Sequence, residues 1–184
     1  MCIKMAREVE IPQDVNFEIV GNTLKVSGQK ATLEKTFPVK NIKIERKENK
    51  LIITQIQKTS KNRAIIGSYE AHLKNMFKGA NKEFLYKLKV CSGHFPMSVK
   101  AQGNELQVSN FLGGKKMQKI TIPQEVNVKI NGEIIEVSSS NIEKAGNFAS
   151  KIESMTRLNK KDRRIFQDGI FMIEKNGVEI KWVT

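Results

Sequence analysis

The chain has 184 residues, a length that allows one domain or two small ones. Hydrophobic residues make up 39% of it, enough for a core, and no apolar run approaches the roughly 20 residues that a membrane-spanning helix needs. The 32 basic and 19 acidic residues give a net charge of +13 and a pI near 9.8. This excess indicates a polyanionic partner such as nucleic acid, with a basic protein that has no such partner as the alternative.

The cysteines and the N-terminal segment exclude further classes. Cys2 and Cys91 form neither a Cys-x-x-Cys pair nor a cluster with histidine, so we expect no metal site and no disulfide framework. The first eleven residues alternate charged and apolar side chains and lack the apolar core of a secretory signal. We therefore expect a cytoplasmic protein that does not associate with a membrane.

The first half of the chain predicts strands followed by one helix. Two alternating runs, residues 15–19 and 24–26, flank Gly21 and Asn22, a pattern typical of a β-hairpin with one buried face. Apolar residues at helical spacing then predict a helix that faces the core. This stripe comprises Ile65, Ile66, Tyr69, Leu73, Met76 and Phe77.

The second half repeats this order. Alternating runs flank Gly103 and Asn104, and a second apolar stripe at helical spacing follows. The stripe comprises Ile142, Ala145, Ala149, Ile152 and Met155. Ser140 and Glu143 have the spacing of a capping box at the start of this helix.

Two internal matches suggest a duplication. Residues 11–16 resemble residues 122–127, but this match fails further on, where strand-like residues 30–40 would face helix-like residues 141–156. Residues 21–27 resemble residues 103–109, and this register carries strands and helix in the same order. It predicts an α+β fold of two duplicated domains, residues 1–81 and 82–184, each a mainly antiparallel β-sheet packed against one α-helix.

No pattern indicates catalysis. Nucleotide-binding glycine motifs are absent, and the Gly-Gly-Lys-Lys at 113–116 lacks the rest of a P-loop. His94 is expected to be a loop histidine with no group nearby to tune it, and a Cys91–His94 pair lacks an orienting residue. An enzyme acting on phosphorylated substrates would need a polar constellation that the sequence does not show. We therefore expect no catalytic residue, no cofactor and no small-molecule substrate.

The basic residues concentrate after the second helix. Five of them stand within nine residues, opposed only by Asp162: Arg157, Lys160, Lys161, Arg163 and Arg164. A solvated helix end is the alternative, but five cations exceed what capping explains, and arginine forks suit phosphate. Lys115 and Lys116, beside two glycines, form a second candidate phosphate site or an ordinary turn. No DNA-reading motif is present, so we expect recognition of structured RNA through its backbone.

Residues 158–172 closely resemble the C-terminal signature of the large-subunit ribosomal protein L-six family, in its archaeal and eukaryotic branch. The most specific part is Arg164-x-Phe166-x-Asp168-Gly169, with Lys161 three residues upstream. Phe171 stands where that signature often has tyrosine. Residues 10–12, 94–99 and 110–113 also look like this branch, so the resemblance covers nearly the whole chain.

The resemblance implies two duplicated α+β domains and a structural role in the large ribosomal subunit. The second domain would bind large-subunit ribosomal RNA near the site of translational GTPases, with ribosomal proteins and translation factors as neighbours. The matching positions are Arg157, Lys160, Lys161, Arg163, Arg164, Gln167, Asp168 and Gly169, to which the charge argument adds Lys115 and Lys116. For Asp168 and Gly169 the sequence itself indicates only a turn. The alternative is an RNA-binding protein outside the ribosome.

Overall fold

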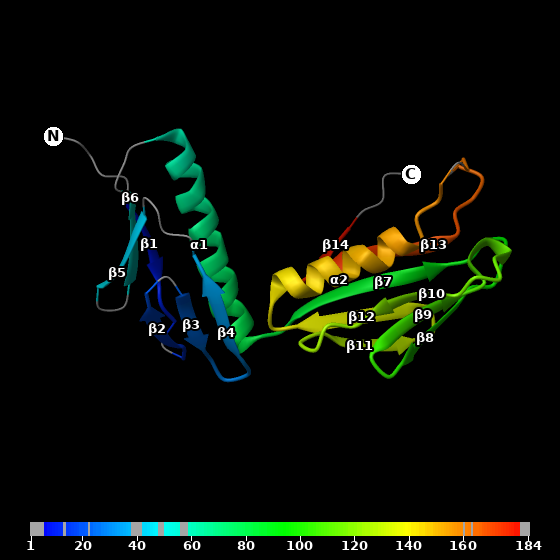
Figure 1. The fold of residues 1–184 in the computed structure, drawn as a ribbon, viewed down its shortest axis with the longest axis horizontal. Coiled ribbons are helices and arrows are strands. Elements are labelled where there is room, and N and C mark those ends of the chain that lie inside the picture. The colour runs from blue at the N-terminus through cyan, green and yellow to red at the C-terminus, as the bar shows by residue number, and fades with distance from the viewer. Residues whose placement is uncertain are drawn as a thin grey trace. The chain divides into compact units, whose positions relative to one another are not determined.

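The computed structural model describes residues 6–12, 14–21, 23–37, 42–47, 50–55, 59–159, 161, 162 and 164–180. The chain divides into two compact units, residues 1–83 and residues 84–184 (Figure 1). Each unit has its own hydrophobic core and is described by itself.

Unit 1 (residues 1–83) contains strands that form two three-stranded antiparallel sheets, with strand orders β1-β6-β5 and β2-β3-β4. The predicted hairpin is confirmed: β2 and β3 pair around Gly21, whose φ of 60° matches the tight turn. The elements are β1 (Ala6–Glu10), β2 (Asn16–Val20), β3 (Thr23–Ser27), β4 (Thr32–Thr36), β5 (Ile42–Lys47), β6 (Lys50–Gln55) and α1 (Ser60–Asn81).

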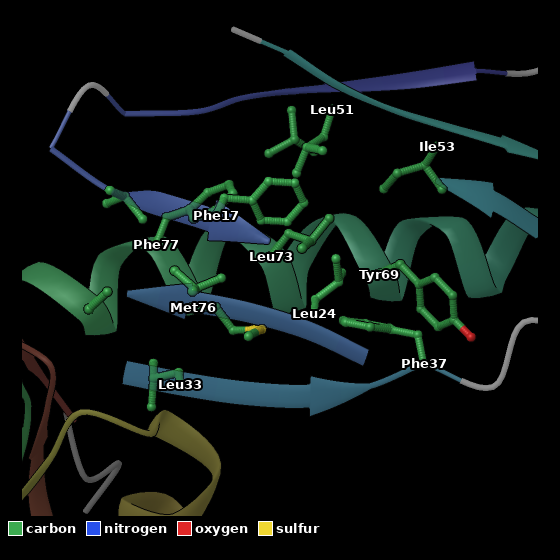
Figure 2. Packing of buried hydrophobic residues seen from close by; sticks show 14 of the residues in the cluster. Phe17, Leu24, Leu33, Phe37, Leu51, Ile53, Tyr69, Leu73, Met76 and Phe77 are labelled. Carbon is green, nitrogen blue, oxygen red and sulfur yellow. The ribbon is translucent and has the colours of Figure 1, made fainter. Parts of the chain in front are cut away.

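Helix α1 closes the core of unit 1 against both sheets. Figure 2 shows Leu24 of β3 and Leu51 of β6 directed toward Leu73 of α1, and all three side chains are fully buried. Tyr69 packs edge-on against Phe37, with ring centroids 4.6 Å apart. The predicted apolar stripe is thereby confirmed except at Ile65.

Ile65 is 39% exposed, so its assignment to the core is wrong. Neighbouring helix residues point about 100° apart, and Ile66 occupies the direction that faces the sheets. On the same helix, the Glu70 carboxylate accepts hydrogen bonds from Lys74, at 2.7 Å, and from Arg7 of β1. These hydrogen bonds hold the pKa of Glu70 below its usual value.

Unit 2 (residues 84–184) has the same plan with additions. Its strands form a five-stranded sheet, β11-β12-β7-β13-β14, and a three-stranded sheet, β10-β9-β8, while α2 packs against β7, β12 and β13. The elements are β7 (Phe84–Cys91), β8 (Ser98–Gln102), β9 (Glu105–Ser109), a 3-10 turn (Phe111–Gly113), β10 (Gln118–Thr121), β11 (Asn127–Asn131), β12 (Ile134–Ser139), α2 (Ile142–Met155), β13 (Gly169–Lys175) and β14 (Val178–Glu179).

The strand pairing confirms the duplicated α+β fold. The order β1-β6-β5 corresponds to β7-β12-β11, and β2-β3-β4 corresponds to β8-β9-β10. The match of residues 21–27 with 103–109 therefore superposes equivalent strands, whereas the match of 11–16 with 122–127 does not. Each unit divides its strands between two sheets where one was expected, because its first strand pairs with its sixth instead of with its neighbour.

The start of α2 differs from the predicted capping box. Asn141 is the N-cap, and its side-chain oxygen accepts hydrogen bonds from the N–H groups of Glu143, at 2.9 Å, and Lys144, at 3.4 Å. The assignment of this role to Ser140 is wrong by one residue, because the helix begins at Ile142. Phe148, which the predicted stripe omitted, is 1% exposed and belongs to the core of unit 2.

Candidate nucleic-acid interface

Residues 157–168, which lie between Thr156, the C-cap of α2, and the start of β13, form the basic loop. The basic loop and β13 have no counterpart in unit 1 among the described elements. The loop is drawn in orange in Figure 1. Strand β13 pairs antiparallel with β7 so that Gly169 lies opposite Cys91. The end of the basic loop therefore lies beside the turn that follows β7, residues 92–97, here called the 92–97 turn.

A buried hydroxyl fixes the base of the basic loop. The Thr156 side chain, at the end of α2, accepts a hydrogen bond from the N–H of Ile170 at 2.9 Å and donates to the carbonyl of Glu153 at 3.3 Å. Thr156 is only 3% exposed. The residue before the basic loop is thus tied to the second residue of β13, so the loop starts and ends at a fixed place.

Asp168 ties the basic loop to the 92–97 turn. Its carboxylate is 2% exposed, and Oδ1 accepts hydrogen bonds from the N–H of Gly93 and, at 3.1 Å, from that of His94. The next residue, Gly169, lies where a Cβ would come within 3.1 Å of the Phe171 ring. These contacts give a physical reason for an Asp-Gly pair that looked in the sequence like a plain turn.

Asp162 organises the middle of the basic loop. Its side chain accepts a hydrogen bond from the N–H of Arg164 at 2.9 Å, and its carbonyl accepts from the N–H groups of Ile165, at 3.2 Å, and Phe166, at 3.0 Å. Phe166 is flanked by the Lys161 ammonium, 4.5 Å from the ring centre. The Asp162 carboxylate thus bonds to the backbone of the basic loop, and within the described residues it forms no ion pair with Lys161 or Arg164.

The 92–97 turn also contacts the loop that carries the second basic group. The Phe95 ring packs against Gly113, where a Cβ would come within 3.1 Å of the ring. The Asn110 side chain donates a hydrogen bond to the carbonyl of Pro96 at 2.9 Å. One turn therefore joins the basic loop on one side to the loop of residues 110–117 on the other, at one end of unit 2.

The described cations of these two loops are exposed. Within the described residues, no ion pair is formed by Arg157, Lys161, Arg164, Lys115 or Lys116. Six lysines in other parts of the described chain do pair with glutamates: Lys25, Lys50, Lys74, Lys87, Lys119 and Lys144. The positive charge at this end of unit 2 is thus available to an external anion.

The remaining predicted site residues fall into three groups. Arg157 and Gln167 are exposed, and the Arg157 N–H donates to the carbonyl of Ser154 at 3.2 Å. Lys160 and Arg163 lie outside the described residues. Asp168 and Gly169 are buried, so they support the surface from beneath.

His94 is placed differently from the expectation. Its Nδ1 lies 3.7 Å from Oδ2 of Asp168, and its ring lies 5.3 Å from that of Phe166. The expectation of no group nearby is therefore wrong. No local signal reveals this partner, because 74 residues separate it from His94 in the chain.

Two further properties concern the described part of the chain. It contains no group of three or more His, Cys, Asp or Glu side chains that could hold a metal ion. None of the helices it forms is long and apolar enough to cross a membrane.

Comparison with known proteins identifies the family. A family model described as "Ribosomal protein L6" matches residues 11–83 and 95–169, and the second match spans the basic loop. "Large ribosomal subunit protein uL6" of Sulfurisphaera tokodaii is 37% identical, covering 96% of this chain and 95% of the relative. The protein of the same name from Methanosarcina mazei is 37% identical, covering 95% of this chain and 99% of the relative. That of Methanococcus vannielii is 36% identical, covering 92% of this chain and 93% of the relative. The chain therefore belongs to the ribosomal protein L6 family, whose members are structural ribosomal components and not enzymes.

Proposed function

We propose that this protein is a structural constituent of the large ribosomal subunit that binds and stabilises large-subunit ribosomal RNA near the binding region of translational GTPases. Family membership and the names of the relatives support the assignment to the large ribosomal subunit. The observation that carries the RNA contact is that Lys161 and Arg164 are exposed and form no ion pair within the described residues, on a loop fixed at both ends.

The mechanism is electrostatic anchoring. Lys161 and Arg164 approach phosphates from the basic loop, where the arginine can make a forked contact and the lysine a point contact. Each phosphate neutralised releases condensed counterions, which drives binding. Lys160 and Arg163 add to this charge on sequence grounds, and the exposed Gln167 amide can donate to a phosphate or a sugar.

The fold contributes preorganisation. Thr156 and Asp168 fix the basic loop before RNA arrives, so less conformational entropy is lost on binding. Lys115 and Lys116 extend the contact on the other side of the 92–97 turn, which suits a structured RNA recognised by shape. Neighbouring ribosomal proteins would contact the other surfaces, and translation factors would bind nearby.

The test compares binding to purified large-subunit ribosomal RNA of Methanosarcina mazei over a range of salt concentrations. A Lys161→Ala/Arg164→Ala variant is measured beside a Lys25→Ala/Lys50→Ala control, which removes two exposed lysines that glutamates already neutralise. We expect the slope of log affinity against log salt to flatten by roughly two units in the first variant and to stay unchanged in the control.

An unchanged slope in the first variant would show that the basic loop is not the anchor. Equal affinity of the wild-type protein for small-subunit ribosomal RNA would instead favour a general binder of structured RNA outside the ribosome.

A further inference from the structure

Within the described residues, one oxygen of the buried Asp168 carboxylate has no hydrogen-bond donor. Oδ1 accepts from two backbone N–H groups, but Oδ2 is buried and accepts no hydrogen bond within the described residues. A buried carboxylate oxygen without a donor is costly. The His94 Nδ1 lies 3.7 Å away, just beyond hydrogen-bond distance, so a small rotation of the imidazole would supply the missing proton.

The surroundings of His94 restrain its ring without covering it. The imidazole lies against the Phe166 ring, with centroids 5.3 Å apart, yet 49% of the side chain is exposed. On the same Phe166 ring, the Lys161 ammonium lies 4.5 Å from the centre. Two nitrogen-bearing groups therefore flank one aromatic ring at the surface of the basic loop.

The geometry assigns a role to this arrangement: His94 binds a backbone phosphate of RNA through Nε2. Asp168 is the positioning residue that orients the imidazole through Nδ1, and Lys161 supplies a second contact to the same phosphodiester segment. The imidazole has a nitrogen on each side, so one ring can face the Asp168 carboxylate and a phosphate together. This inference rests on the proposed function and adds a binding residue to it.

Two conservative variants separate binding from support. His94→Gln keeps a donor near the position of Nε2 and loses the contact with Asp168, whereas His94→Asn keeps a donor near Nδ1 and cannot reach a phosphate. His94→Ala removes both. His72→Gln, in unit 1, is the matched control, because His72 is the other histidine of the chain.

Affinity is measured for large-subunit ribosomal RNA of Methanosarcina mazei at one fixed salt concentration. We expect His94→Ala and His94→Asn to bind about tenfold more weakly, the value of one charge-assisted hydrogen bond. His94→Gln should bind about threefold more weakly, because it keeps the donor but Asp168 no longer positions it, and His72→Gln should bind like the wild-type protein. A His94→Asn variant that binds like the wild-type protein would overturn the proposal and leave His94 a purely structural role. So would His94→Ala with wild-type affinity.

A second readout keeps this inference separate from the proposed function. Inorganic phosphate is titrated into the full chain without RNA, and the imidazole nitrogens are followed by ¹⁵N NMR. We expect the Nε2 signal of His94 to shift and that of His72 to stay unchanged. If the wild-type protein does not bind ribosomal RNA but this shift occurs, the proposed function is wrong and the phosphate site at His94 is supported. If the His94 variants bind RNA like the wild-type protein and phosphate shifts no His94 signal, the phosphate site is wrong and the proposed function is unaffected.

Discussion

The Thr156→Val substitution tests whether the base of the basic loop depends on one buried hydroxyl. Valine has nearly the shape of threonine but cannot accept the hydrogen bond that the N–H of Ile170 donates at 2.9 Å. Because Thr156 is 3% exposed, water cannot easily replace that acceptor. A buried donor left without a partner costs about 1–3 kcal/mol, so we expect unit 2 to lose roughly 2 kcal/mol of unfolding free energy.

Urea unfolding followed by NMR measures each unit separately, with amide signals of Ile152 for unit 2 and Leu73 for unit 1. Thr156→Ser is the control, since it keeps the oxygen and loses only a methyl group, and we expect it to cost about 1 kcal/mol or less. The stability of unit 1 should not change in either variant. Equal stability of the valine and serine variants would refute the assigned role of the hydroxyl.

Five further substitutions test local features of both units. At Gly28 a Cβ would lie 2.6 Å from a backbone oxygen of α1, so Gly28→Ala should lower the denaturation midpoint of unit 1. Gly67 of α1 has open space around its Cβ position, so Gly67→Ala should raise the unfolding free energy of unit 1 by up to about 1 kcal/mol. Asn141→Ala should lower the unfolding free energy of unit 2, measured with urea, by about 1 kcal/mol, and Ser140→Ala should leave it nearly unchanged. The reverse order would show that Ser140, and not Asn141, caps α2. Because the pKa of Glu70 is lowered in the folded state, its carboxylate stabilises unit 1 above pH 4.5, and this stability is lost as the pH falls through the folded-state pKa. Unit 1 of Glu70→Gln should therefore lose less stability on acidification, measured by thermal unfolding at a series of pH values; an identical loss would contradict the assignment.

Local patterns predicted much of the fold. The turns at Gly21 and Gly103 marked hairpins because both positions have positive φ, which glycine adopts without strain. Apolar spacing located both helices, since one face of each must cover a sheet. The internal match of residues 21–27 with 103–109 then predicted the duplication, and the equivalent strand orders of the two units confirm it.

Long-range contacts set the limit of these predictions. The division into two sheets follows from the pairing of β1 with β6, which lie some forty residues apart in the chain. No local sequence pattern in either strand indicates that they pair. The function of Asp168 depends on the N–H groups of Gly93 and His94 across the β7–β13 pair. A charge count could find the basic loop, but not the residues beneath it that hold it in place.

The most direct test of the central claim is sedimentation of this protein from a native lysate through a gradient at low and at high salt. The proposed function predicts that the protein travels with the large ribosomal subunit at low salt and is released at high salt. The Lys161→Ala/Arg164→Ala variant should be released at a lower salt concentration, because fewer phosphates are neutralised. Wild-type protein that stays at the top of the gradient at low salt would contradict a role in the large subunit.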